Sequence, residues 1–183
     1  MKQKIRRLGL LVLMLAVFLF GGCREKLGEE RYFAYRQQPF LAEINGNLSG
    51  VSFVATLEGK FDKKEGPRYC LTYSSPPALN GLCIELDKAQ TQVRLGETVL
   101  VDDTEQFTGW ARPINALMGT PQNDFAPSLP IVSVQREGKN WELKLEGGKV
   151  LTLSNLFLPL AYQDEQTELR IIWWEQNCSQ NSP

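Results

Sequence analysis

The chain of 183 residues contains no histidine. Histidine is the commonest general base and the commonest metal ligand, so its absence excludes a Ser-His-Asp or Cys-His site and leaves zinc only thiolates and carboxylates. The serines in the loop at residues 74–81 also lack the glycine elbow that frames a nucleophile. The sequence therefore predicts a non-catalytic protein without a metal or a cofactor.

Long runs of one charge sign are absent too. The chain has 20 basic and 21 acidic residues, a net charge of −1. Nucleic-acid-binding domains usually carry a basic patch, so we expect no nucleic-acid partner. The acidic residues at 102–105 lack the spaced Asp, Asn and Gly of a calcium loop and are interpreted as a solvated loop.

A hydrophobic run long enough for a transmembrane helix is missing as well. The apolar run at residues 8–20 would span about 20 Å as a helix, against a hydrocarbon core of about 30 Å. Four basic residues precede this run, and Gly21, Gly22 and Cys23 follow it. This order is typical of a bacterial lipoprotein signal, in which small residues before the cysteine permit cleavage.

On this interpretation residues 1–22 are a signal peptide and Cys23 carries the lipid. Phe20 stands where such a signal usually has leucine, and the alternative is an ordinary secretory signal followed by an incidental Cys23. Two or three acyl chains, palmitate among them, would anchor the protein stably at the outer face of the cytoplasmic membrane. Removing the signal removes its four basic residues and leaves a net charge of −5, so the acyl chains and not charge would hold the protein there.

Cysteines are few, and beside Cys23 there are only Cys70, Cys83 and Cys178. Export permits disulfides. Cys70 and Cys83 lie in two predicted strands joined by the loop at 74–81, where they could approach each other, although an ideal hairpin does not place them opposite. A Cys70–Cys83 disulfide and two free, buried thiols both fit the sequence.

Most of the remaining sequence has the period-two alternation of β-strands. Residues 23–37 are polar and predict a tether, which Tyr32, Phe33 and Tyr35 interrupt, so that part of it could dock on the domain. The domain at 38–176 begins with a long hairpin that has its turn signal at Asn45-Gly46, and the tail at 177–183 is predicted to be disordered. Strands are expected at 40–44, 51–57, 68–73, 82–86, 92–95, 98–101, 131–136, 141–146, 150–154, 158–162 and 169–175, in the spacing of an antiparallel meander.

One short helix breaks this series at residues 110–119. Pro113 suits a first helical turn and Gly119 a C-cap. Ile114, Leu117 and Met118 form an i, i+3, i+4 stripe, which gives the helix one apolar face.

The order of signal, cysteine, tether, hairpin, meander and helix resembles the lipoprotein-carrier superfamily of LolA and LolB, and within it small lipoproteins of clostridial-type bacteria. Patterns of strand and turn carry the resemblance, at residues 53–55, 71–76, 79–82, 147–153 and 172–175. It implies a mainly antiparallel α+β fold, a curved sheet or half-barrel with the short central helix packed on its concave face. The chain departs from the carriers in lacking a long N-terminal helix.

In such a fold the apolar space between helix and sheet can hold acyl chains or receive a hydrophobic element of a partner. This makes Trp110, Ile114, Leu117 and Met118 candidate ligand-binding residues, and the alternative is that they simply fill the core. Trp173 and Trp174 are neighbours in a strand, so only one of them can face the core.

The expected function is therefore that of a monomeric, extracytoplasmic, membrane-anchored lipoprotein that binds an apolar ligand, such as a lipid acyl chain, or an envelope protein. The alternative is a structural or assembly factor of the cell envelope. Such a factor would act through an exposed sheet edge or an exposed aromatic surface.

Overall fold

The computed structural model describes residues 28–62, 64–87, 91–102, 108–119 and 130–176. Contacts divide the chain into two units, Met1–Arg31 and Tyr32–Pro183, and the second contains the packed domain. The predicted signal at 1–22, Cys23, Cys178 and the tail at 177–183 lie outside the described residues. Within the described segments, no helix has the length and apolar character needed to cross a membrane.

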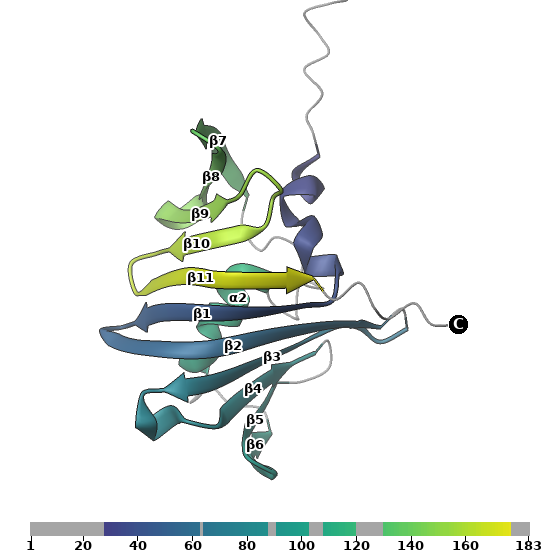
Figure 1. Ribbon diagram of the computed structural model, residues 1–183, viewed down its shortest axis with the longest axis vertical. Coiled ribbons are helices and arrows are strands. Elements are labelled where there is room, and N and C mark those ends of the chain that lie inside the picture. Colours follow the sequence, from purple (N-terminus) through teal and green to yellow (C-terminus); the bar gives the residue numbers. More distant parts are fainter. Residues whose placement is uncertain (1–27, 63, 88–90, 103–107, 120–129, 177–183) are drawn as a thin grey trace, which may run out of the picture. The chain divides into compact units, whose positions relative to one another are not determined.

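The domain is built on one open, curved antiparallel sheet of 11 strands (Figure 1). Their order is β6-β5-β4-β3-β2-β1-β11-β10-β9-β8-β7, so the first and last strands pair in the middle and β6 and β7 form the edges. The mainly antiparallel fold predicted from the sequence is confirmed. The strands are β1 (Phe40–Leu48), β2 (Val51–Asp62), β3 (Gly66–Ser75), β4 (Leu82–Leu86), β5 (Thr91–Leu95), β6 (Thr98–Asp102), β7 (Ile131–Glu137), β8 (Asn140–Leu145), β9 (Lys149–Leu153), β10 (Pro159–Gln163) and β11 (Thr167–Gln176).

The first hairpin turns later than predicted. β1 runs on through Asn45 and Gly46, and the turn lies at Ser49 and Gly50, both with positive φ. Asn47 Oδ1 accepts a 2.8 Å hydrogen bond from the Gly50 N–H and closes the turn. Gly46 instead lies opposite Phe53, where an added Cβ would come within 2.5 Å of the Phe53 ring. The turn prediction at Asn45-Gly46 is wrong because close packing, not a turn, requires this glycine.

The helix α2 (Thr108–Met118) packs on one face of the sheet, here called the inner face, and contacts β3, β10 and β11. In Figure 1 it lies behind β1 and β11. It begins two residues earlier than predicted, so Pro113 stands inside the helix and not in its first turn. Pro113 has no N–H to donate to the preceding turn. Packing of the apolar face therefore sets the extent of this helix more than local propensity does.

The segment predicted as a tether is not free of the domain. Residues Glu29–Gln37 form a 3₁₀ helix, η1, and Tyr32, Phe33 and Tyr35 belong to the hydrophobic core. Two further short 3₁₀ turns, η2 (Pro77–Leu79) and η4 (Glu146–Gly148), connect strands. The packed part of the chain thus includes residues 32–37, ahead of the predicted domain start at 38.

Candidate functional site

Three side-chain donors of other elements bond to main-chain carbonyls of α2, and Arg112 of α2 itself donates to the side chain of Gln166. The Tyr73 hydroxyl donates to the carbonyl oxygen of Trp110 at 2.6 Å. At the other end of the helix, the Tyr35 hydroxyl and Arg36 Nε both donate to the carbonyl oxygen of Leu117, at 2.6 and 2.8 Å. The helix is therefore held near both of its ends by donors from β3 and η1.

Arg36 is a buried cation, with 7% of its surface exposed. Its guanidinium carbon lies 4.3 Å from the centre of the Phe33 ring, and its Nε approaches the C-terminal end of α2, where the helix dipole is negative. Its Nη1 atom is buried without a hydrogen-bond partner. The charge is thus offset by a carbonyl and a ring, which is weaker compensation than an ion pair gives.

Buried tyrosines supply much of this hydrogen bonding. Burial raises the pKa of Tyr35, Tyr69 and Tyr73, and in Tyr35 and Tyr69 the charge of Arg36 offsets part of that effect. Each hydroxyl therefore stays protonated at neutral pH and acts as a donor, Tyr69 to the carbonyl of Arg36 at 2.8 Å. These pKa shifts arise from burial, and the three hydroxyls concerned all donate to main-chain carbonyls.

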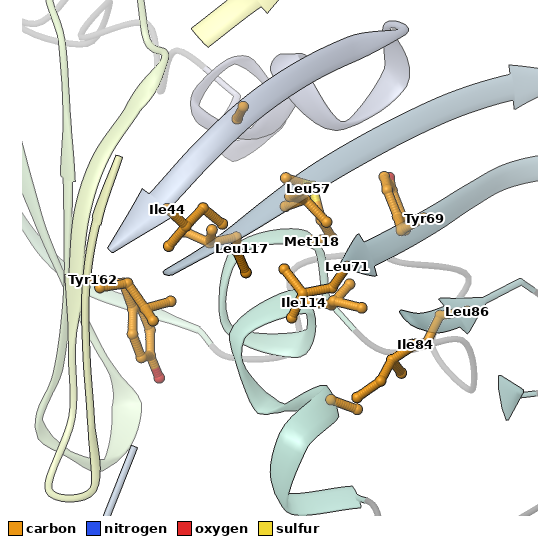
Figure 2. Close-up of a cluster of buried hydrophobic side chains, with 14 of the residues drawn as sticks. Ile44, Leu57, Tyr69, Leu71, Ile84, Leu86, Ile114, Leu117, Met118 and Tyr162 are labelled. Carbon is orange, nitrogen blue, oxygen red and sulfur yellow. The ribbon is translucent and has the colours of Figure 1, made fainter. Parts of the chain in front are cut away.

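The predicted ligand-binding residues come together on the inner face. Ile114, Leu117 and Met118 have no exposed surface and pack among Ile44, Leu57, Leu71 and other side chains of the sheet (Figure 2). Trp110 is half-buried and meets Tyr73 edge to face at 5.6 Å. In this arrangement, side chains of the sheet cover the apolar stripe of α2.

Sequence reasoning missed the donors that hold the helix. Tyr35 and Arg36 lie in the segment predicted as a tether, and their contact with Leu117 spans 82 and 81 residues. The cluster Tyr32, Phe33 and Tyr35 was the available signal, because three aromatic residues in a charged segment favour docking over solvation.

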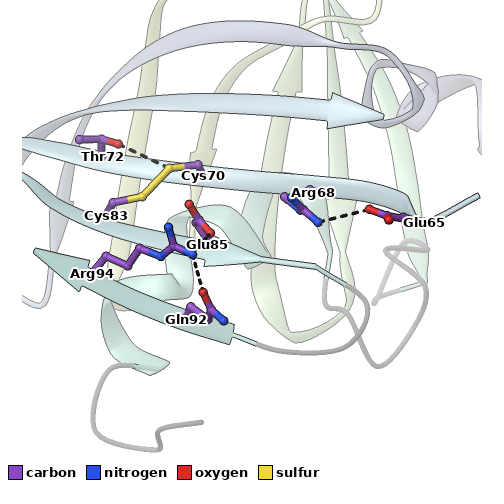
Figure 3. A network of polar contacts seen from close by, with 8 residues as sticks. All are labelled: Glu65, Arg68, Cys70, Thr72, Cys83, Glu85, Gln92 and Arg94. Carbon is purple, nitrogen blue, oxygen red and sulfur yellow. Dashed lines mark hydrogen bonds and ion pairs between the residues drawn. A yellow bond between two sulfur atoms is a disulfide. The ribbon is translucent and has the colours of Figure 1, made fainter. Parts of the chain in front are cut away.

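Cys70 and Cys83 form a disulfide between β3 and β4 on the other face of the sheet, here called the outer face (Figure 3). Their Cα atoms are 6.4 Å apart and diagonal in the ladder, since Cys70 pairs with Glu85 and Cys83 with Thr72. Glu85 lies close to both sulfurs and pairs with Arg94 at 3.3 Å. Because the sulfurs are bonded to each other, they are not available as thiolate ligands for a metal.

A hollow of about 460 Å³ opens near the middle of the sheet, at β1, β2, β11 and the end of β3. We call it the outer hollow. Its polar lining consists of Asn45, Asn47, Ser52, Ser75, Glu168 and Arg170. In period-two strands the buried Ile44 and Leu48 point inward, so Asn45 and Asn47 point outward.

Trp173 and Trp174 lie on opposite faces, as the alternation predicts. Trp174 stacks on Phe40 at 4.0 Å in the core, whereas Trp173 is 39% exposed. A bulge leaves Ile172 without a partner in β1, because Glu43 pairs with Trp173 and Ile44 with Ile171. Ile172 and Trp173 are consequently both exposed.

No family model matches the chain, and no curated protein matches it. Among solved structures, the chain is similar to an uncharacterized conserved protein from Thermus thermophilus, with a TM-score of 0.52 and 13% identity over 80% of this chain and 83% of that one. This similarity indicates a shared fold.

Two further solved structures show weaker similarity to the chain. A putative outer membrane lipoprotein-sorting protein domain from Vibrio parahaemolyticus has a TM-score of 0.44 and 9% identity, over 80% of this chain and 89% of that one. A LolA superfamily protein from Nitrosomonas europaea has a TM-score of 0.37 and 9% identity, over 77% and 87%.

Proposed function

We propose that the protein is a non-catalytic binding module, anchored through acyl chains on Cys23 at the outer face of the cytoplasmic membrane. Its ligand is apolar and binds between α2 and the inner face of the sheet. The observation that carries this proposal is the way α2 is attached. The helix is amphipathic, with its apolar stripe wholly covered, and its ends are held by hydrogen bonds to two carbonyls, of Trp110 and Leu117.

A ligand reaches the stripe only when the helix is displaced. Each hydrogen bond at the helix ends contributes about 1 kcal/mol, and burial of Ile114, Leu117 and Met118 contributes about 1.5–3 kcal/mol each, so the displacement is costly. When the helix moves, Ile114, Leu117 and Met118 become available to an acyl chain, which replaces the contacts that they make with the sheet. The ligand gains the apolar burial that the sheet loses, and binding is weak because it must first displace the helix.

The titratable groups support a non-catalytic role. The described groups with shifted pKa values are tyrosines in structural hydrogen bonds and two turn aspartates. In Asp62 the backbone N–H groups of Glu65 and Lys64 lower the pKa. Burial raises the pKa of Asp164, but hydrogen bonds from Gln166, Tyr162 and Thr167 outweigh it and lower the pKa. Most of the hydrogen bonds that lower these two pKa values come from backbone N–H groups of the same turn, which is typical of aspartates that stabilise turns.

Photo-crosslinking tests the proposal in membranes of the host. A diazirine-bearing fatty acid is added to membranes containing the full-length protein, and the modified peptides are mapped by mass spectrometry. We expect modification of the α2 segment around Leu117 and Met118. Tyr73→Phe removes one bond that holds the helix, about 1 kcal/mol, and should raise the yield at low probe concentration about fivefold.

Tyr162→Phe is the matched control, because its hydroxyl donates to Asp164 at 3.0 Å and not to α2. It should leave the crosslinking yield unchanged. Labelling confined to the outer face, or an equal response of both variants, would refute binding under the helix.

A protein ligand is the second candidate, and the sheet edges favour it. Val99 and Leu100 of the edge strand β6 and Val132 of the edge strand β7 are exposed, by 44% to 69%. An edge strand presents unpaired backbone groups to which an extended segment of another protein can add. In that case the protein acts as an assembly factor of the envelope.

A further inference from the structure

The outer hollow is centred on β1, whose backbone is paired on both sides, while the lining residues Ser52 and Ser75 are each paired with a neighbouring strand on one side only. β1 is hydrogen-bonded to β2 on one side and to β11 on the other along the whole stretch from Asn45 to Asn47. An extended peptide needs an open strand edge to add to a sheet. Along Asn45–Asn47 a ligand of this hollow therefore meets side chains and not free backbone.

The charges in the hollow favour a neutral ligand. Arg170 and Glu168, one cation and one anion, pair at 3.4 Å, and both side chains remain more than half exposed. A phosphate or carboxylate ligand is usually bound by cations in excess of anions. Here the lining has no such excess, so the pair offers donors and acceptors to a polar but uncharged molecule.

The remaining polar groups are amides and hydroxyls, and the amide of Asn47 is held in place by its own hydrogen bonds. Asn47 bonds the Gly50 N–H through Oδ1 and approaches Ser52 Oγ through Nδ2 at 3.4 Å, which orients its amide. Asn45 and Ser52 are exposed beside it, and Ser75 borders the hollow from β3. The lining thus supplies both donors and acceptors to a ligand with many hydroxyl groups.

An aromatic ring lies next to the hollow on the same face. Trp173 of β11 pairs with Glu43, and Glu43 lies two residues, or roughly 7 Å, along β1 from Asn45. The Trp173 N–H donates to Glu43 Oε2 at 3.2 Å, so the exposed part of the indole is mostly ring carbon. A fixed indole with an apolar surface is a platform for the C–H face of a sugar ring.

We propose that the outer hollow binds an uncharged oligosaccharide. One sugar hydrogen-bonds with Asn45, Asn47 and the Arg170–Glu168 pair, and the adjoining sugar packs on Trp173. The site lies on the opposite face from α2, so it is separate from the apolar site proposed above. If the protein fails to bind sugar, the proposal of an apolar site under α2 is unaffected. For an anchored envelope protein, such a site would bind a surface glycan.

Binding of defined sugars tests this assignment. The full-length protein in detergent is titrated with chitotetraose, cellotetraose and maltotetraose, with saturation-transfer NMR and tryptophan fluorescence as readouts. We expect one of them to bind with a dissociation constant of about 1 mM or tighter. Asn45→Ala and Trp173→Ala should each weaken that binding by about tenfold or more.

Arg170→Ala provides a third variant, because its side chain is exposed and its removal leaves the core intact. Gln135→Ala, an exposed polar residue of the edge strand β7, is the control and should bind as the parent does. Thermal unfolding confirms that each variant is folded. Absence of binding by all three sugars at about 10 mM, or binding that survives Asn45→Ala and Arg170→Ala, would overturn the proposal; so would a peptide that competes for the hollow in place of sugar.

Discussion

The hydroxyl of Tyr73 lies 2.6 Å from the carbonyl oxygen of Trp110, so a buried residue of β3 holds the N-terminal part of α2. Tyr73→Phe keeps the ring and removes this bond. We expect a loss of about 1 kcal/mol in the free energy of unfolding, measured by urea denaturation, because one buried hydrogen bond contributes about that much. A variant as stable as the parent would show that Tyr73 does not hold the helix.

Stability should fall in alkaline solution. Burial raises the pKa values of Tyr35, Tyr69, Tyr73 and Tyr162 above the value near 10 of an unfolded chain. Folding thus favours the protonated hydroxyls. The contribution of these hydroxyls to the free energy of unfolding is complete below about pH 10 and is lost as the pH rises toward the folded-state pKa values.

The measurement is the free energy of unfolding as a function of pH from about 8 to 12, with tyrosinate absorbance recorded in parallel. In Tyr73→Phe the free energy of unfolding should decline less steeply with rising pH, because one buried hydroxyl is absent. Ionisation of all the tyrosines near pH 10 in the folded protein would contradict the burial of these hydroxyls.

Two glycines should respond in opposite directions to alanine. An added Cβ at Gly59 collides with the ring of Phe40, which itself stacks on Trp174, so Gly59→Ala should destabilise the domain by about 1–3 kcal/mol. Gly109 of α2 has open space around it, and Gly109→Ala should stabilise the helix by about 0.5–1 kcal/mol. Equal effects in thermal unfolding would contradict the close packing at Gly59.

The anchor makes a separate prediction. Cys23→Ser removes the only thiol at which a lipoprotein signal could be modified, so the protein should leave the membrane fraction or accumulate as uncleaved precursor. Labelled palmitate should enter the parent and not the variant. Unlabelled parent protein with unchanged fractionation would disprove lipidation at Cys23.

The periodicity of the sequence predicted the features that depend only on the spacing of residues within one helix or strand. The alternation in β1 and β2 and the stripe of Ile114, Leu117 and Met118 both follow from the geometry of one element, and the structure places these residues inside. The position of the first turn was mispredicted because Asn45-Gly46 is a good turn sequence taken alone. Gly46 is instead required in the strand because the ring of Phe53, from the neighbouring strand, packs against it.

The features of the candidate sites depend on contacts across the chain. Tyr35 reaches Leu117 over 82 residues, and the bulge at Ile172 appears only when β11 is paired with β1. The outer hollow is likewise assembled from strands at both ends of the domain. Single-sequence patterns contain none of these pairings, so they identified the residues of α2 without the groups that hold them.

Native mass spectrometry of the protein purified from its own host tests the central claim most directly. Spectra are compared before and after denaturation, because a covalent lipid on Cys23 survives denaturation whereas a lipid bound under α2 does not. We predict a bound lipid in the native spectrum, lost on denaturation, in a protein that otherwise has no partner. A stoichiometric protein partner without bound lipid would contradict the account of an apolar ligand site and favour an assembly factor.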